Sequence, residues 1–240
     1  MKKIFIVANW KLNPIAEKKA GVLFSTIQES VREEIEDLGE AEVVICPPFL
    51  YLPVLKKEQK REPEEQRIEL GSQDCFWEDK GAFTGEVSPL MLRDMGCKYV
   101  IVGHSERRKF FSENDEMVNK KIKAALKHGL RPIVCIDKLD QAEAALQGID
   151  EEQKKKVIVA YELLWAIGSG KPCSYEQARE FNLSLKEVIG SDHPTLYGGS
   201  VNAENAVGFI SESQFQGLLI GGASLRPDEF FEIIRSVRER

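Results

Sequence analysis

Long hydrophobic runs and a positive net charge are both missing from this sequence. No stretch of its 240 residues approaches the ~18 consecutive apolar residues of a membrane-spanning helix. The net charge of −6 argues against a general binder of nucleic acid. The apolar run that follows Met1 ends at the polar segment Asn9–Lys11, which makes it too short for a signal peptide. We therefore expect a cytoplasmic protein with neither a membrane nor a nucleic acid as its partner.

Cysteine and histidine are also sparse, and this argues against several kinds of site. The five cysteines include no Cys-x-x-Cys pair, so reduced thiols are expected instead of a disulfide framework. The cysteines and the three histidines lack the spacing of a metal site, and no Ser-His-Asp set is evident. No Gly-x-Gly-x-x-Gly follows the first predicted strand, which weakens the case for a dinucleotide. We expect no metal and no cofactor.

Short β-branched runs recur eight times along the chain. They are Ile4–Ala8, Glu42–Cys46, Ile68–Gly71, Tyr99–Val102, Pro132–Ile136, Val157–Tyr161, Thr195–Tyr197 and Gly217–Ile220. Most are apolar on both faces, which is typical of parallel strands covered by helices. Helical spacing between them is clear in Lys18–Ile35, Asn119–His128, Asn202–Ile210 and Asp228–Val237.

This alternation of strand and helix continues without a break in composition. It predicts one parallel α/β domain over residues 1–240, and eight repeats favour a closed (β/α)₈ barrel over an open doubly wound sheet. Two charged segments, Lys56–Arg67 and Asp137–Lys156, are predicted to be solvated additions to this barrel. The first is expected to be a loop or a helix end, and the second an outer helical layer.

Polar residues that follow the strands of such a barrel line its active face. Lys11 follows the first predicted strand, His104 the fourth and Glu162 the sixth. Glycine-rich turns follow the seventh and eighth strands at Gly198–Ser200 and Gly221–Ser224, and such turns expose backbone N–H groups that bind phosphate. Each feature also has a structural explanation, as a surface lysine, a core histidine, a paired carboxylate or a plain turn. Taken together, they indicate a phosphate-binding barrel with an acid–base pair.

Six segments of the chain resemble motifs of the triosephosphate isomerase family. They are Asn9–Asn13, Gly81–Glu86, Ile101–Arg108, Tyr161–Lys171, Tyr197–Val201 and Gly221–Leu225. They occur in the family's order over nearly the whole chain. The resemblance implies a (β/α)₈ barrel without a cofactor. It also implies the interconversion of D-glyceraldehyde 3-phosphate and dihydroxyacetone phosphate through an enediolate, in glycolysis and gluconeogenesis.

The resemblance also implies roles for individual residues. Glu162 would be the base that takes a carbon-bound proton, and His104 would polarise the carbonyl oxygens. Lys11 would supply positive charge to the enediolate and the phosphate, and Asn9 would hydrogen-bond near the reacting oxygens. Glu106 would be the charged partner beside Lys11.

Further residues would hold the phosphate, cover the site and join two subunits. The phosphate ligands would be Gly168, Ser200, Gly221 and Gly222. Trp165 would anchor a lid, Leu164–Lys171, that closes over the enediolate and excludes water. The loop Gly71–Glu86 would bury against a second copy of the chain in a homodimer, with Thr84 reaching toward the neighbouring active site.

Four residues depart from the family pattern. Leu163 replaces a proline at the first lid hinge, which frees its φ angle, so we expect a more mobile lid and a lower turnover. Pro172, in the second hinge, would offset part of that freedom. Lys138 stands where the family has a glutamate that holds the lid tryptophan. Asp74 replaces an asparagine, and this either weakens an interface hydrogen bond or adds a charge that needs a partner.

Two alternatives are weighed against this interpretation. One is a different phosphosugar isomerase or a phosphate-binding lyase on the same scaffold. The other is a degenerate barrel that serves as an interaction protein. An assay with glyceraldehyde 3-phosphate separates them, and a turnover below about 1 s⁻¹ would favour the second.

Overall fold

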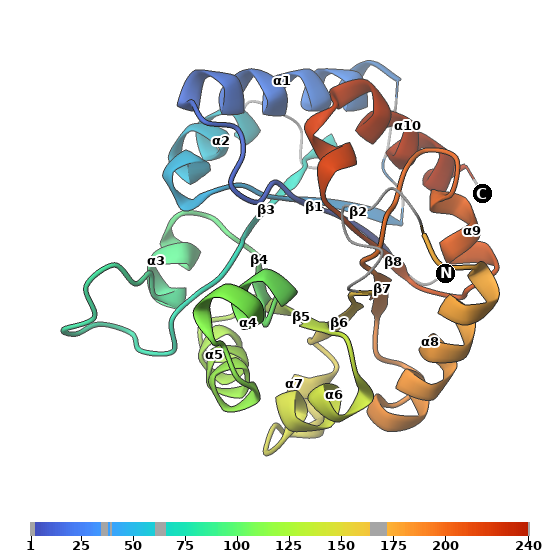
Figure 1. Ribbon diagram of the computed structural model, residues 1–240. Helices are drawn as coiled ribbons and strands as arrows, with labels where there is room; N and C mark the ends of the chain where they lie inside the picture. The colour runs from blue at the N-terminus through green and yellow to red at the C-terminus, as the bar shows by residue number, and fades with distance from the viewer. Residues whose placement is uncertain (1–2, 35–37, 39, 61–65, 164–171, 240) are drawn as a thin grey trace.

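Eight parallel strands form one closed barrel in which neighbours along the chain are neighbours in space (Figure 1). The computed structural model describes residues 3–34, 38, 40–60, 66–163 and 172–239. The strands are β1 (Ile4–Asn9), β2 (Ala41–Cys46), β3 (Glu69–Ser72), β4 (Tyr99–Val102), β5 (Arg131–Ile136), β6 (Ile158–Tyr161), β7 (Thr195–Tyr197) and β8 (Gly217–Ile220). The ends of every strand lie within one residue of the predicted run, so the predicted (β/α)₈ barrel is confirmed.

Closure of the barrel depends on a close approach of β1 and β8. Phe5 in β1 pairs with Gly217 in β8. A Cβ atom at Gly217 would lie 2.1 Å from the carbonyl oxygen of Phe5, so any side chain there would push the two backbones apart. Glycine is therefore required at this position of β8.

Alternate residues of each strand face opposite sides of the barrel wall. In β1, Phe5 and Val7 belong to the cluster of side chains that fills the barrel interior. Ile4 and Ile6 instead pack with helix residues such as Phe24 outside the wall. Because both sides are buried, the strand sequences are apolar on both faces, as expected for parallel strands.

Helices fill the connections and surround the barrel (Figure 1). They are α1 (Glu17–Glu34), α2 (Leu52–Gln59), α3 (Pro89–Asp94), α4 (Ser105–Phe111), α5 (Asp115–Lys127), α6 (Leu139–Leu146), α7 (Glu151–Lys154), α8 (Tyr175–Ile189), α9 (Ala206–Ser211) and α10 (Pro227–Arg238), with 3₁₀ turns η1 (Phe49–Tyr51) and η3 (Gly222–Leu225). Among the described residues, no helix has the length and apolar character needed to cross a membrane.

Two of the predicted helix starts were wrong, and capping side chains explain both. The helix expected from Asn119 begins at Asp115, because the Asn114 side chain accepts a hydrogen bond from the amide of Met117 and caps it. The helix expected from Asn202 begins at Ala206. There the Asn202 side chain accepts from two following amides and holds a turn ahead of the helix.

The two charged segments differ in their outcome. Residues 137–156 contain α6 and α7, as the predicted outer helical layer requires. The segment from Lys56 begins inside α2, and its residues 61–65 lie outside the described part of the chain. Gln59 in that segment is buried and donates to the carbonyl of Ile68 at 2.8 Å, so it is not a purely solvated addition.

The connection between β3 and α3, residues 73–88, projects away from the barrel (Figure 1). We call it the β3–α3 loop. Its Asp79 carboxylate lies 2.7 Å from Nζ of Lys127 and 2.6 Å from Nε2 of His128, so the loop is tied to the end of α5. Its tip, including Phe83 and Thr84, is exposed.

Candidate active site

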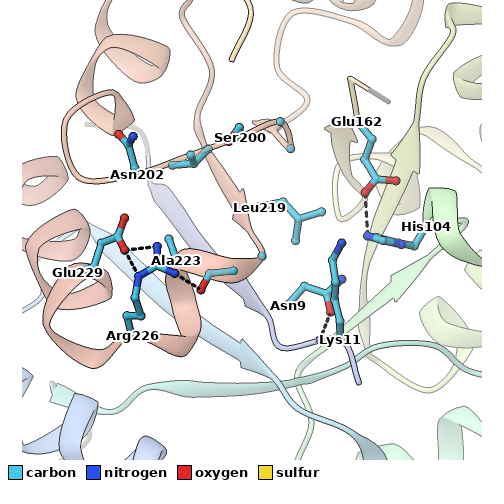
Figure 2. A pocket seen from close by; sticks show the side chains of 15 residues that line it. Asn9, Lys11, His104, Glu162, Ser200, Asn202, Leu219, Ala223, Arg226 and Glu229 are labelled. Atoms are coloured by element: carbon cyan, nitrogen blue, oxygen red, sulfur yellow. Dashed lines mark hydrogen bonds and ion pairs between the residues drawn. The ribbon is translucent and has the colours of Figure 1, made fainter. Parts of the chain in front are cut away.

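A cavity of about 430 Å³ opens at the carboxyl ends of the strands. Its walls come from the segments that follow β1, β4, β6, β7 and β8 (Figure 2). Seven residues predicted to form the site line it, namely Asn9, Lys11, His104, Glu162, Ser200, Gly221 and Gly222. Of the other three, Glu106 contacts Lys11, whereas Trp165 and Gly168 lie outside the described residues.

Glu162 follows β6 directly and is 2% exposed. Its Oε1 lies 2.9 Å from Nε2 of His104 (Figure 2). Its Oε2 accepts a hydrogen bond of 2.7 Å from the amide of Ser105. Burial, and next the Glu162 carboxylate, raise the pKa of the Cys135 thiol well above its ordinary value, so this neighbour stays protonated. The carboxylate thus faces the cavity with one oxygen hydrogen-bonded and the other beside the imidazole.

His104 is both a wall of the cavity and the N-cap of α4. Its Nδ1 accepts a hydrogen bond of 3.2 Å from the amide of Glu106, an acceptor role that a nitrogen carrying a proton cannot play. A neutral imidazole in this position therefore carries its proton on Nε2, the nitrogen that faces Glu162. The start of the helix fixes the tautomer.

Lys11 adopts an uncommon backbone conformation with φ of 54°. Two hydrogen bonds hold it there: its amide donates to Oδ1 of Asn9 at 3.0 Å, and its carbonyl accepts from Gln73 at 2.9 Å. Its Nζ lies 2.6 Å from Oε1 of Glu106. A Cβ atom at Gly221 would lie 3.5 Å from Cε of Lys11, so the ammonium reaches the glycine turn after β8.

Glycine brings two turns close to these groups. The amide of Gly198 donates to the carbonyl of Tyr161 at 2.7 Å, which joins the turn after β7 to the strand end that carries Glu162. A Cβ atom at Gly199 would lie 2.2 Å from the hydroxyl of Tyr197, so a side chain does not fit. Gly221 and Gly222 lead into η3 after β8. Backbone N–H groups in such turns suit an anion.

Two residues that flank the lid segment, Leu163 and Cys173, lie at a second, small cavity. Leu163 is partly buried and packs on the outer core, and it lines a space of about 190 Å³ with Tyr161, Cys173 and Gln177. Pro172 is exposed. The lid itself, residues 164–171, lies outside the described residues, so the expected effects of Leu163 and Pro172 on it stay predictions.

Lys138 lies beside α4 and precedes α6. With Asp137 it lines a cavity of about 570 Å³ whose other wall includes Ser105 and Phe110. The side chain of Gln141 accepts from the amide of Asp137 at 2.9 Å. The expected contact with Trp165 involves a residue outside the described part of the chain.

A cluster of four charges, three of them buried, lies behind the His104 turn and was not predicted from the sequence. Nζ of Lys121 lies 2.7 Å from Oδ1 of Asp74 and 2.8 Å from Oε2 of Glu113, and Nε of Arg107 lies within 2.9 Å of both carboxylates. Oε1 of Glu113 accepts from the amide of Gly103 at 2.9 Å. The charge that Asp74 adds therefore has partners within the same chain.

Arg226 and Glu229 were also missed as lining residues of the main cavity. Their place ahead of α10 and in its first turn resembles ordinary helix capping, so no local pattern marked them as lining a cavity. Among the described residues, no group of three or more His, Cys, Asp or Glu side chains has the arrangement of a metal site.

Comparison with known proteins assigns the chain to a family. The family model for triosephosphate isomerase matches residues 4–237. The chain is 40% identical to the triosephosphate isomerase of Dictyoglomus thermophilum over 258 aligned positions, which cover 98% of this chain and 100% of that protein. It is 40% identical to that of Thermoanaerobacter pseudethanolicus (98% and 99% covered) and 39% identical to one from Dehalococcoides mccartyi (98% and 96%). The chain therefore belongs to the triosephosphate isomerase family.

Proposed function

We propose that this cavity interconverts D-glyceraldehyde 3-phosphate and dihydroxyacetone phosphate, the reaction of the family, and that Glu162, His104 and Lys11 carry it. The observation that supports this most is the 2.9 Å separation between the carboxylate of Glu162 and Nε2 of His104 at one wall of the cavity. A carbon acid next to a carbonyl needs a base at the carbon and a proton donor at the oxygen. Glu162 supplies the base and His104 the proton donor, and the two lie close enough together to act on one substrate molecule.

Glu162 is the proposed base. Its carboxylate is removed from bulk water, which prevents solvent from competing for the transferred proton. Oε2 is engaged by the amide of Ser105, so the side chain exchanges this contact for the substrate's C–H group when it acts. The reaction moves protons between two carbons and between two oxygens of one substrate and leaves its overall oxidation state unchanged, which is why no redox cofactor is needed.

His104 is the proposed electrophile. Because Nδ1 accepts from the amide of Glu106, Nε2 carries the proton and donates it toward the substrate's oxygens. A neutral imidazole in this role is the established arrangement in the family. Lys11 and Asn9 complete the polar wall: the ammonium compensates the enediolate charge, and the amide of Asn9 hydrogen-bonds near the reacting oxygens.

The phosphate is proposed to bind at Ser200, Gly221 and Gly222, with Gly168 joining from the lid. The turns after the last two strands of a (β/α)₈ barrel are frequent phosphate sites. The closeness of Lys11 to Gly221 supports this placement, because one cation then serves both the phosphate and the enediolate. Trp165 is proposed to anchor the lid that covers the intermediate.

A Glu162→Gln variant tests the assignment. It removes the base but leaves the glycine turns, so kcat should fall by about 10²–10⁴-fold while the affinity for inorganic phosphate stays within a factor of three. Glu116→Gln, on the exposed face of α5, is the control and should be fully active. Unchanged turnover in Glu162→Gln would overturn the catalytic assignment.

We also propose a cytoplasmic homodimer joined through the loop Gly71–Glu86. The projection of the β3–α3 loop and the exposed side chain of Phe83 at its tip support this. Leu12 and Ile15, in the β1–α1 connection, are each 89% exposed, and exposed apolar side chains of this kind favour a protein interface. Sedimentation should show a dimer at micromolar concentration. A fully active monomer there would contradict the proposal.

A further inference from the structure

The main cavity has a second cation at the end away from the proposed base. Arg226, Glu229 and Asn202 lie on one side of the cavity, and Glu162 and His104 lie on the opposite side (Figure 2). The residues assigned to the proton transfer leave this arginine without a role, although it lines the same space.

The position of Arg226 is fixed by its neighbours in the chain. Its amide donates to the carbonyl of Ala223 at 3.2 Å, and its Nη1 donates to the carbonyl of Gly222 at 3.3 Å. The guanidinium therefore lies against the glycine turn where the phosphate is proposed to bind. Nε and Nη2 both donate to Oε2 of Glu229, one turn into α10. Three of the five N–H groups are used in this way, and two remain for a further acceptor.

The pair of Arg226 with Glu229 is weak enough to exchange. The side chain of Arg226 is 63% exposed, and ion pairs in contact with water contribute little to stability. A phosphate dianion carries more charge than a carboxylate and offers two oxygens in the spacing of the guanidinium fork. A phosphate dianion is therefore a stronger competitor than a monoanion for the donors that Glu229 holds.

We propose that Arg226 is a specificity residue that donates to the phosphate of the substrate, and that Glu229 holds the guanidinium until a dianion competes for it. The inference rests on the proposed phosphate site at Gly221 and Gly222. Lys11 and Glu106 repeat the arrangement of a cation beside a glutamate, with Nζ 2.6 Å from the carboxylate. Each cation is thus balanced by a glutamate, which lowers the attraction for simple monoanions.

Arg226→Gln is the central variant, and Arg235→Gln is its matched control. Arg235 lies on α10, the helix that Arg226 precedes, and pairs with Glu232 at i−3 with an N–O distance of 2.6 Å; its loss changes the net charge equally. Arg226→Gln should raise KM for glyceraldehyde 3-phosphate and the inhibition constant of inorganic phosphate about 5- to 20-fold, or about 1–2 kcal/mol, with kcat within a factor of two. Arg235→Gln should change neither constant by more than a factor of two.

Two further measurements separate a phosphate contact from a structural role. In Arg226→Gln, kcat/KM for unphosphorylated glyceraldehyde should be unchanged, because that substrate makes no phosphate contact. Glu229→Gln should lower the inhibition constant of inorganic phosphate about 2- to 3-fold, since the competing carboxylate is gone. The conservative variant Arg226→Lys should restore part of the lost affinity.

The proposal fails if Arg226→Gln leaves KM and phosphate inhibition within a factor of two of the wild type, or if Arg235→Gln produces the same change. It also fails if glyceraldehyde turnover falls in parallel. A wild-type chain without isomerase activity would instead sink the proposed function. In that case calorimetric binding of inorganic phosphate to the two arginine variants still decides the role of Arg226.

Discussion

Removing the Lys121 ammonium should destabilise the fold strongly, because it is the central cation of the buried cluster behind His104. The Lys121 side chain is 2% exposed and contacts both Asp74 and Glu113. In Lys121→Met these two carboxylates share Arg107 alone, so the cluster carries one uncompensated negative charge. Breaking a buried pair in this way costs about 3–5 kcal/mol. For a chain of this size, that corresponds to a fall in Tm of about 6–20 °C.

The size of the loss should depend on Asp74. Adding Asp74→Asn to Lys121→Met removes the excess charge and leaves Glu113 paired with Arg107, so Asp74→Asn should gain about 1–3 kcal/mol more in the Lys121→Met background than it gains in the wild type. The assay is guanidinium unfolding at pH 7.5 and fixed protein concentration. Lys120→Met is the control, because the neighbouring lysine is exposed and pairs with Glu116, and it should change stability by less than about 0.5 kcal/mol.

This reasoning is refuted if Lys121→Met costs less than about 1 kcal/mol, or if Asp74→Asn gains no more in the Lys121→Met background than in the wild type. Recovery has a consequence for the active site as well. Because Glu113 accepts from the amide of Gly103, the cluster supports the residue immediately before His104. Lys121→Met should therefore also lower kcat at temperatures where it remains folded.

Three other predictions concern single positions. Burial raises the pKa of Asp74 from 3.8 to about 6 against the opposing effect of Lys121, so the protonated carboxyl stabilises the fold below pH 3.8 and this stabilisation is lost as the pH rises to about 6. In urea unfolding, the stability of Asp74→Asn relative to the wild type should increase by about 2–3 kcal/mol between pH 4 and pH 6, and a difference that does not change with pH would refute the sign. Gly217→Ala should lower the free energy of unfolding by at least about 3 kcal/mol in thermal unfolding, because its Cβ would meet a carbonyl oxygen. Gly21→Ala, with ordinary contacts in α1, should be neutral or stabilising, and equal effects of the two variants would contradict the argument that barrel closure requires Gly217. His104→Asn keeps a capping side chain but loses the Nε2 donor, so kcat should fall at least about 10²-fold with little change in Tm. The free energy of unfolding of His104→Ala should be about 1 kcal/mol lower than that of His104→Asn, and a fully active His104→Asn would refute the proposed role.

The sequence was sufficient for the barrel and for the groups at its rim. Each strand is a short apolar run bounded by polar residues, and parallel strands with both faces buried are apolar throughout, so such runs can be recognised as strands from the sequence. Lys11, His104 and Glu162 could be placed together because each directly follows such a run, and the carboxyl ends of parallel strands meet at one edge.

The charged contacts could not be predicted in the same way. Lys121 follows Asn119 and Lys120 in a polar stretch that is typical of a solvated helix face, yet its side chain is buried. Its partner Asp74 lies 47 residues away, and only the tertiary fold brings the two together. Arg226 and Glu229 carry an i,i+3 spacing that any exposed helix start shows. A local pattern says nothing about which surface faces a cavity.

His104 both lines the cavity and caps α4, so its presence in a sequence does not by itself indicate an active enzyme. The imidazole begins α4, so a barrel that had lost its enzymatic role would still be under pressure to keep a side chain there that accepts from the Glu106 amide. A screen that scores only cellular abundance would then recover Asn, Asp or Ser at this position alongside the native residue. The carboxylate of Glu162 likewise accepts from the amide of Ser105, the first residue of α4, so abundance alone would not separate active from inactive descendants at that position either.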